Sequence, residues 1–287
     1  MPPDARPTPE QVIHTQREDW NRVAPAWEKW DRRLDGNMAF VCHRLVADSR
    51  LRPGQRVLDL GSGTGYPALL SAEAVGREGT VIGLDLAERM LAVARRKAAA
   101  LHLSNVTFQT ADVTRLPFEA ASFDAVISRF CLMFLPEIPN TLAEIARVLK
   151  PSGYLAAAVW SAPEKNPFIT IPMKVLASHL TLPPPDPEQP GIFRLARAGD
   201  LSRMAEQAGL RGVEDEELTG EACYVSADEY YNSLMETAAP IQPLFATLSA
   251  GDKAKAQAEI KGAAEQYRRG NGLAIPMAIR IVAARKP

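Results

Sequence analysis

Short apolar runs alternate with helical segments through the middle of the chain. Five runs have the length and the mostly apolar character of strands that are buried on both faces: 56–60, 80–84, 106–109, 123–128 and 154–160. Segments of helical length lie between most of them: 68–75, 87–101 and 138–149. Strands that alternate with helices in this way predict an α/β fold with a doubly wound, mostly parallel sheet.

Helical segments also precede and follow this alternating region. Residues 11–49 have a helical pattern and are rich in tryptophan, with Trp20, Trp27 and Trp30 close together. Beyond residue 160, two helical inserts precede the last predicted strand at 274–284. Ligands of open α/β sheets bind at the carboxyl ends of the strands, where these inserts emerge. We therefore expect the inserts to cap a pocket.

These segments define a predicted domain organisation. In chain order its parts are an N-terminal helical lid at 1–50, a ligand-binding core at 51–160, a cap insert at 161–199, a continuation of the core at 200–226, a second helical cap insert at 227–270 and a final core strand at 271–287. The prolines at 183–187 predict a rigid loop within the first insert.

Composition and charge narrow the class of protein. The 287 residues carry 33 Lys and Arg against 34 Asp and Glu, and this balance argues against nucleic acid as the main partner. The three cysteines are odd in number and far apart, which favours a reducing cytoplasm. No apolar run is long enough for stable membrane insertion, and no signal peptide follows the charged start. Nothing in the pattern indicates the oligomeric state.

A glycine-rich turn follows the first predicted strand and carries the sharpest chemical signal. Gly61, Gly63 and Gly65 are spaced G-x-G-x-G and allow the backbone to lie close to a ligand. The dinucleotide fingerprint is instead G-x-G-x-x-G, which seats a pyrophosphate on a helix N-terminus. Asp59, just before the turn, is poorly placed beside a pyrophosphate and suits a ligand with a positive amino group.

Two further carboxylates follow the next two predicted strands. Asp85 ends the second strand, where a carboxylate can accept hydrogen bonds from both hydroxyls of a ribose. Asp112 follows the third strand, in position to accept from the exocyclic amine of an adenine. With Asp59 they form a row of three carboxylates without a phosphate partner. The implied ligand has an adenine, a ribose and an aminocarboxylate arm.

These residues and several other motifs resemble the class I S-adenosylmethionine-dependent methyltransferases, in the type 11 branch that includes quinone-biosynthesis and other small-molecule enzymes. The motifs are Val57 to Gly65, Gly83-Leu84-Asp85-Leu86, Ala111-Asp112-Val113 with Leu116-Pro117-Phe118, Ser122-Phe123-Asp124 and Arg147 to Gly153. The resemblance covers 52–160 strongly and 200–210 weakly. It departs from the family at Ser152, where a glycine is usual.

The resemblance implies S-adenosylmethionine as cofactor and a seven-stranded sheet whose last strand is antiparallel. It assigns these residues to the cofactor: Asp59, Gly61 and Gly63 at the methionine arm, Gly65 in the same glycine-rich turn, Asp85 at the ribose, Leu86 and Met90 beside the adenine, Asp112 and Val113 at the adenine edge, and Ser128 and Arg129 between the cofactor and the substrate mouth. Trp20 and Trp27 either close over the cofactor or only pack their helix onto the core.

The sequence names no catalytic residue, and this agrees with the chemistry. Methyl transfer from a sulfonium needs an aligned nucleophile, and a general base only where the nucleophile keeps its proton. We expect no metal, because the histidines lack ligand spacing and no carboxylate cluster follows the fourth strand. The apolar caps indicate a small lipophilic or aromatic acceptor. The predicted function is therefore methylation of a small molecule at O, N or C.

Three alternatives stay open at this point. One is a nicotinamide-dependent oxidoreductase, which the glycine spacing disfavours. Another is a non-catalytic module that binds S-adenosylmethionine without turnover. The third is an arsenite methyltransferase, because a related branch holds arsenite on cysteine thiolates and this chain has Cys42, Cys131 and Cys223.

Overall fold

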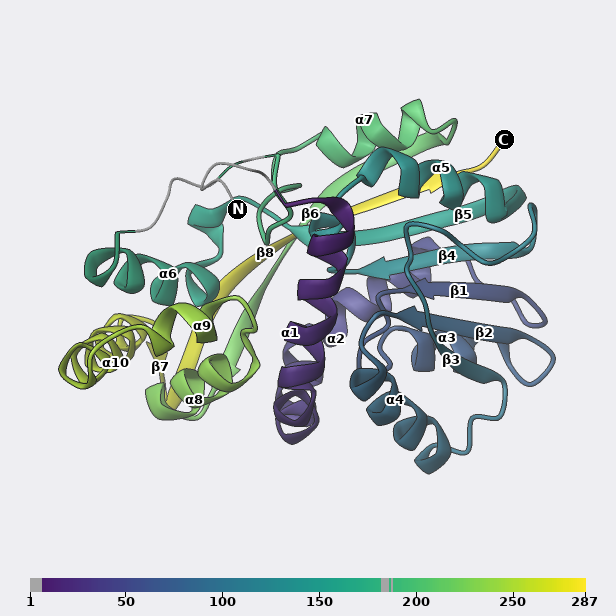
Figure 1. Cartoon of the computed structure of the whole chain (residues 1–287). Coiled ribbons are helices and arrows are strands. Elements are labelled where there is room, and N and C mark those ends of the chain that lie inside the picture. Colours follow the sequence, from purple (N-terminus) through teal and green to yellow (C-terminus); the bar gives the residue numbers. More distant parts are fainter. Residues whose placement is uncertain (1–6, 182–185, 187) are drawn as a thin grey trace.

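One mixed sheet forms the centre of the molecule (Figure 1). The computed structural model describes residues 7–181, 186 and 188–287. Within them the strand order is β3-β2-β1-β4-β5-β8-β6, and a two-residue strand, β7, pairs with β8. The strands are β1 (Arg56–Leu60), β2 (Thr80–Asp85), β3 (Val106–Thr110), β4 (Phe123–Arg129), β5 (Leu149–Trp160), β6 (Arg211–Tyr224), β7 (Arg268–Arg269) and β8 (Gly272–Arg285).

The direction of the strands confirms the predicted fold class. β1 pairs in parallel with β2 and β4, and β3 and β5 continue the parallel part. β8 is antiparallel to both β5 and β6. Apart from β7, the described sheet is therefore the doubly wound, mostly parallel sheet of seven strands with an antiparallel last strand.

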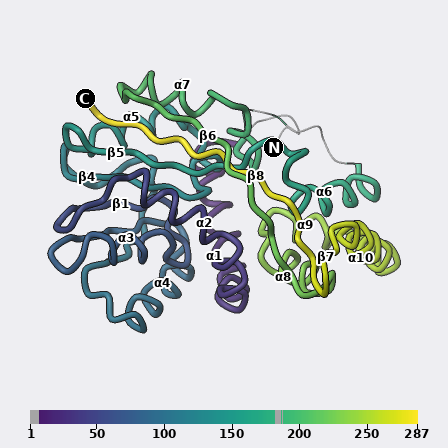
Figure 2. The backbone as a smooth tube through the Cα atoms, turned by 180° about the vertical axis from the view of Figure 1, so that it is seen from behind, coloured from purple at the N-terminus to yellow at the C-terminus, as the bar shows by residue number. Residues whose placement is uncertain are grey.

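Helices cover both faces of the sheet. They are α1 (Pro9–Lys29), α2 (Asp31–Asp48), α3 (Ala68–Val75), α4 (Glu88–Ala100), α5 (Ile138–Val148), α6 (Pro167–His179), α7 (Asp200–Gln207), α8 (Ala227–Thr237), α9 (Ile241–Ala246) and α10 (Ala250–Glu265), with short 3-10 turns η1 (Leu132–Phe134) and η2 (Pro163–Lys165). α2 contacts α3, and α5 contacts α7 (Figure 2). No helix within the described ranges is both long and apolar enough to cross a bilayer.

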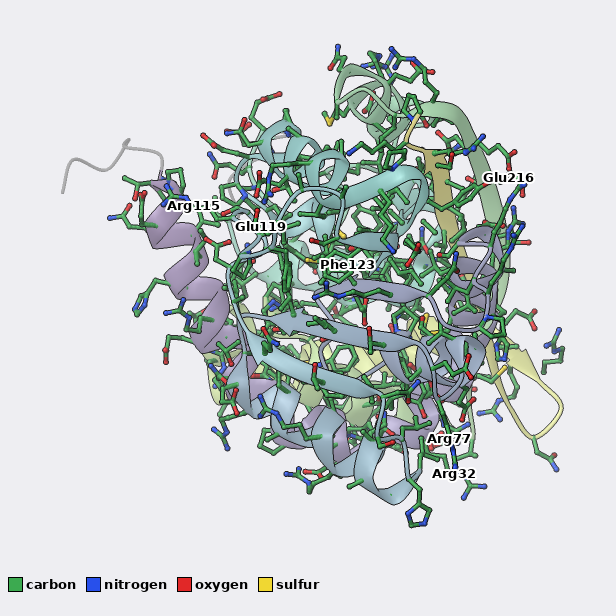
Figure 3. All side chains as sticks on the ribbon, turned by 90° about the vertical axis from the view of Figure 1, so that its right-hand side faces the viewer. Arg32, Arg77, Arg115, Glu119, Phe123 and Glu216 are labelled. Atoms are coloured by element: carbon green, nitrogen blue, oxygen red, sulfur yellow. The ribbon has the colours of Figure 1, made fainter. Side chains whose placement is uncertain are left out.

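The central strands consist mostly of apolar residues, and helices cover both faces of the sheet that they form. Leu58 and Leu60 of β1 and Ile127 of β4 are fully buried. Figure 3 shows Phe123 within the layer of the sheet, whereas Arg77 lies at the periphery of the molecule. The hydrophobic effect on these runs, about 25 cal/mol per Å² of apolar surface, drives the strands together.

The capping helices gather at one end of the molecule. Figure 1 shows α6, α8, α9 and α10 around the ends of β6 and β8 that extend beyond the rest of the sheet. α10 contacts both α6 and α8, so the two predicted inserts meet in space. α1 contacts α4 of the core and also α8 of this group. The helices from three separate segments thus surround the carboxyl ends of the parallel strands.

Two local expectations differ from the structure. The N-terminal helical segment is interrupted at Trp30 and forms two helices. The strand predicted at 154–160 begins earlier, at Leu149, because Ser152 N donates to Lys286 O and Lys286 N donates to Gly153 O. The second insert is helical, in line with the expectation, and contains α8, α9 and α10, the last of which is capped by Ser249. The proline loop expected at 183–187 lies, except for Asp186, outside the described residues.

A buried asparagine joins the start of α6 to β8. Asn166 is fully buried, and its Nδ2 donates to Ser161 O, Ala162 O and Ala278 O at 3.0–3.1 Å. Its Oδ1 accepts from Ala278 N at 2.9 Å. The side chain therefore satisfies backbone groups of two segments that are more than 100 residues apart in the chain.

Replacing Asn166 by alanine is expected to lower the free energy of unfolding by about 2–4 kcal/mol, because buried backbone groups lose their partners. Urea denaturation measures the change. Asn140→Ala is the matched control, since Asn140 is exposed on α5 and should change stability by no more than about 0.5 kcal/mol. An equal effect of the two substitutions would contradict the structural role of Asn166.

Candidate cofactor and acceptor site

A cavity of about 260 Å³ lies at the carboxyl ends of the parallel strands. Three groups of residues line it. The first comes from α1 and α2: Gln16, Trp20, Trp27, Leu34 and Met38. The second comes from the strand ends and the segments after them: Gly61, Ser62, Gly63, Thr64, Tyr66, Asp85, Leu86, Met90, Val113, Arg129, Phe130, Cys131, Phe134, Leu135 and Trp160. The third comes from the caps: Phe168, Ile169, Ile192, Leu234, Thr237, Ala238, Ala239, Pro240 and Ile241.

The glycine-rich turn forms one wall of the cavity. Gly61 and Gly63 have φ values of 71° and 51°, which L side chains rarely adopt. A Cβ at Gly61 would lie 2.5 Å from Cys131 Cβ, whereas a Cβ at Gly63 would meet nothing within 4 Å. Gly61 N and Ser62 N both donate to Leu84 O, which fixes the turn against β2. The backbone at Gly63 therefore faces open space in the cavity.

Asp85 joins this turn to the start of α4. Its Oδ2 accepts from Gly63 N and its Oδ1 accepts from Ala87 N, each at 2.8 Å. Burial raises the pKa of the Asp85 carboxyl, and these backbone hydrogen bonds oppose the rise. The carboxylate thus organises the turn and also contributes to the cavity wall.

Asp59 lies behind the turn with an unsatisfied oxygen. The residue is 0% exposed, its Oδ2 accepts from Ala68 N at 3.1 Å, and its Oδ1 has no hydrogen-bond partner among the described residues. Burial raises the pKa of the Asp59 carboxyl to about 7, although the Arg129 cation lowers it. A buried acceptor without a donor is costly, so this oxygen is suited to a ligand that brings a donor.

The residues predicted at the adenine end are divided between the wall and the layer behind it. Leu86, Met90 and Val113 line the cavity. Asp112 is not among the described lining residues, and its Oδ1 accepts from the backbone and the hydroxyl of Thr114 at 2.9 and 2.8 Å. Its predicted contact with adenine stays a prediction.

The two residues predicted at the end of β4 are also divided between the cavity wall and the layer behind it. Ser128 is fully buried, and its Oγ donates to Leu60 O at 3.1 Å, so it lies behind the described cavity wall rather than in it. Arg129 lines the cavity, and its Nη1 donates to Cys42 Sγ at 3.0 Å. Gly65 of the turn is likewise outside the described lining.

Helix α1 forms a further part of the cavity wall. Trp20 and Trp27 line the cavity, and their rings pack edge to face with centroids 6.0 Å apart. Trp27 Nε1 donates to Thr237 O at 3.1 Å, which ties α1 to α8. On its other side, Asn21 Oδ1 accepts from Arg89 N at the start of α4. Both tryptophans therefore pack the helix and also line the cavity.

Several lining residues were not predicted from the sequence. The most notable are Phe130 and Trp160, whose rings stack with centroids 4.2 Å apart and an interplanar angle of 5°. Phe130 directly follows β4 and Trp160 ends β5. These positions could have identified both residues as lining residues, because the carboxyl ends of parallel strands face the ligand. The pairing of the two rings depends on the strand register, which the sequence does not show.

The three cysteines are dispersed. Cys131 lines the cavity, Cys42 is buried behind Arg129, and Cys223 is exposed on β6. No histidine contributes to the cavity wall in the described part of the chain.

The fold and the cavity together define a Rossmann-like protein with a candidate ligand site at the carboxyl ends of its parallel strands. A family profile described as Methyltransferase domain matches residues 57–153. The chain belongs to the class I S-adenosylmethionine-dependent methyltransferases, and S-adenosylmethionine is the cofactor of this family. This membership excludes the alternative that the protein is a nicotinamide-dependent oxidoreductase.

Named relatives support this membership. The chain is 32% identical over 207 residues to a demethylmenaquinone methyltransferase of Staphylococcus aureus, across 67% of this chain and 85% of that protein. It is 37% identical over 149 residues to a demethylmenaquinone methyltransferase of Symbiobacterium thermophilum, across 51% of this chain and 59% of that protein. The chain spans between 43% and 66% of the length of the first relatives it matches.

A solved structure shares the fold. Phosphoethanolamine N-methyltransferase 2 of Haemonchus contortus, in complex with S-adenosyl-L-methionine, superposes with a TM-score of 0.52 at 21% identity. The superposition covers 100% of this chain and 61% of that one. This likeness supports the Rossmann-like architecture described above.

Proposed function

We propose that this protein transfers a methyl group from S-adenosylmethionine to a small apolar organic molecule, at O, N or C and without a metal ion. The observation that carries the proposal is a single cavity with two unlike walls. One wall has the glycine-rich turn and Asp85, whereas the other has apolar side chains of the caps, such as Phe168 and Leu234.

The cofactor wall fits the parts of S-adenosylmethionine. The unsatisfied Oδ1 of Asp59 suits the ammonium group, and the open backbone face at Gly63 suits the methionine arm. Asp85 suits the ribose hydroxyls, because carboxylates accept strong hydrogen bonds. Leu86 and Met90 supply the apolar contacts that an adenine requires.

The remaining predicted residues take part at different distances from the cavity. Val113, Trp20, Trp27 and Arg129 would contact the ligands directly, since they line the cavity. Three others would act from behind the wall by holding the turn and the strand ends in place: Gly65, Asp112 and Ser128. Asp59 also lies behind the described wall, and its unpaired Oδ1 would receive the ammonium group directly or through a water molecule.

The bound cofactor supplies the electrophilic methyl group. The residues of the chain hold the acceptor in line with it and exclude water. α1 contributes Trp20 and Trp27 to this enclosure, and the caps contribute Ile169 and Ile241. No residue is assigned a covalent role.

Calorimetric titration with S-adenosylmethionine, and separately with S-adenosylhomocysteine, tests the cofactor assignment. We expect both to bind in the micromolar range. Absence of binding by either, also in the presence of candidate acceptors, would refute the assignment.

A turnover assay then separates the enzyme from a non-catalytic module that only binds the cofactor. It measures S-adenosylhomocysteine formed with a panel of quinone-like and phenolic acceptors. Cofactor binding without turnover on any acceptor would favour the binding module.

Two further inferences, on the location of the protein and on its partners, accompany this function. The cytoplasm is the expected location, because the three cysteines are free. Nucleic acid is not an expected partner, because the net charge is −1.

A further inference from the structure

Two segments that leave neighbouring strands meet in the cavity wall. β1 and β4 are parallel neighbours, and Leu60 pairs with Ser128. The chain therefore leaves these strands side by side, at Gly61 and Arg129, and both residues line the cavity. A Cβ at Gly61 would lie 2.7 Å from Cys131 Sγ, so the two segments are in close contact. Arg129 thus lies beside the turn that is proposed to hold the methionine arm.

Arg129 has hydrogen-bond donors that the described residues do not use. Its side chain is partly buried, and its Nη1 donates to Cys42 Sγ at 3.0 Å. A guanidinium has five N–H groups in one plane, and this is the only hydrogen bond of the Arg129 side chain in the described part of the chain. The unused donors face a cavity wall that is otherwise mostly apolar. They are suited to a ligand that brings an anionic acceptor.

The contact with Cys42 orients the guanidinium without neutralising it. Burial raises the pKa of the Cys42 thiol, so near neutral pH this side chain is an uncharged and weak acceptor. Lys97 of α4 also faces this group, but its Nζ is paired with Asp31 Oδ1 at 2.7 Å. Arg129 is therefore the available cation of the described wall.

The charges at this end of the cavity form a pair of opposite sign. Asp59 has an unpaired Oδ1, and Arg129 has unused N–H groups. Asp85, the carboxylate of the wall, already accepts from two backbone N–H groups. Asp35 faces Arg129 from α2, and burial raises the pKa of its carboxyl. A zwitterionic group fits this arrangement, because each of its charges would meet an opposite charge.

We propose that Arg129 binds the α-carboxylate of the methionine arm and that Cys42 is a positioning residue that orients the guanidinium for this contact. The inference rests on the proposed function and names the residues that make the site specific for an intact amino-acid arm. The ammonium group of the same arm goes to Asp59, as proposed above. A guanidinium can donate two parallel hydrogen bonds to one carboxylate, and such charge-assisted pairs are strong.

The first experiment compares ligands that differ only in the arm, by calorimetry on the wild-type protein at pH 8. The probes are S-adenosylhomocysteine, its decarboxylated analogue, which keeps the amine, and methylthioadenosine, which lacks the amino-acid group. The decarboxylated analogue should bind roughly 10–100-fold more weakly than S-adenosylhomocysteine, because it leaves the Arg129 donors without an acceptor. Equal binding of these two ligands would overturn the inference.

The ratio of these two affinities, which we call the carboxylate preference, is then measured in variants of Arg129. Arg129→Met should reduce the preference to less than about threefold and change methylthioadenosine binding by less than about twofold. Both ligands of the ratio carry the ammonium group, so any effect of the substitution on Asp59 cancels. Arg129→Gln should give the same result and replaces Arg129→Met if that variant does not fold.

Arg77→Met is the matched control for the lost charge. Arg77 lies at the periphery of the molecule and does not line the cavity, so its loss should leave the carboxylate preference unchanged (Figure 3). A wild-type preference in Arg129→Met or Arg129→Gln would overturn the role of Arg129. An equal loss of methylthioadenosine binding would also overturn it, because that ligand has no carboxylate.

Variants of Cys42 test its positioning role. Cys42→Ala should reduce the carboxylate preference by roughly 3–10-fold and leave methylthioadenosine binding unchanged, because the guanidinium loses the contact that orients it. Cys42→Ser keeps an acceptor and should restore most of the preference. Cys223→Ala is the control, since Cys223 is exposed and lies outside the described lining. A wild-type preference in Cys42→Ala would show that Cys42 does not position Arg129.

The probes separate this inference from the proposed function. If neither S-adenosylhomocysteine nor methylthioadenosine binds the wild-type protein, the proposed function itself fails. If both bind and the carboxylate adds no affinity, the cofactor assignment stands and the role of Arg129 is wrong.

Discussion

Replacing Asp85 by alanine is expected to weaken the binding of S-adenosylmethionine by roughly 100-fold. The carboxylate is proposed to accept from the ribose hydroxyls, so its removal deletes charge-assisted hydrogen bonds. It also leaves Gly63 N and Ala87 N without their acceptor, and this loosens the turn that lines the methionine arm. Calorimetric titration of the purified variant measures the loss.

Two matched variants make this test specific. Glu119→Ala removes a carboxylate that is exposed before β4 and does not line the cavity, and it should leave affinity unchanged. Asp85→Asn keeps one acceptor oxygen and should lose less affinity than Asp85→Ala. Wild-type affinity in Asp85→Ala would show that the ribose site is assigned wrongly.

Cofactor affinity is expected to rise with pH up to about 7 and then to level off, because Asp59 must be ionised to receive an ammonium group. Its pKa is raised to about 7 by burial, so below that pH the free protein holds a proton that binding must expel. At pH 5 about one molecule in a hundred has the ionised form, and affinity should be lower by up to about 100-fold. Calorimetry across pH 5–8 measures this slope.

Asp59→Asn is the control for the pH dependence. The variant has no carboxyl to titrate, so its weaker affinity should vary little between pH 5 and 8.

The stability of the cofactor-free protein should change with pH in the opposite direction, falling as the pH rises. A carboxyl whose pKa is raised on folding loses its stabilising effect as pH rises from its unfolded value to about 7, and Asp59→Asn should not show this loss. An unchanged slope in the variant would assign the pH dependence to another group.

The glycine-rich turn and the position of Asp85 were predictable because their signals are local. Gly61 and Gly63 adopt the left-handed φ values that glycine allows, and Asp85 lies at a strand end as the pattern predicted. By contrast, the sequence could not show that Asp112 accepts from Thr114, or that Ser128 points to Leu60 O behind the wall. These orientations depend on side-chain rotamers and neighbours rather than on position after a strand.

The acceptor half was the least predictable part. Phe130 and Trp160 meet because β4 and β5 pair in a particular register and the chain turns at a positive φ after β4. The cap helices that complete this half were expected to be apolar, but which of their residues face the cavity depends on how α6 and α8 pack around α10. Helical periodicity alone does not select the facing side.

The sequence by itself determined the alternating strands and helices, the glycine-rich turn and the row of carboxylates, because strand length, glycine spacing and charge are properties of neighbouring residues. Only the tertiary structure decided the enclosure of the cavity. Trp27 of α1 reaches Thr237 of α8 across 210 positions of the chain, and Asp59 acquires its raised pKa only when distant segments bury it. Burial and long-range packing arise from the whole fold, and no local pattern encodes them.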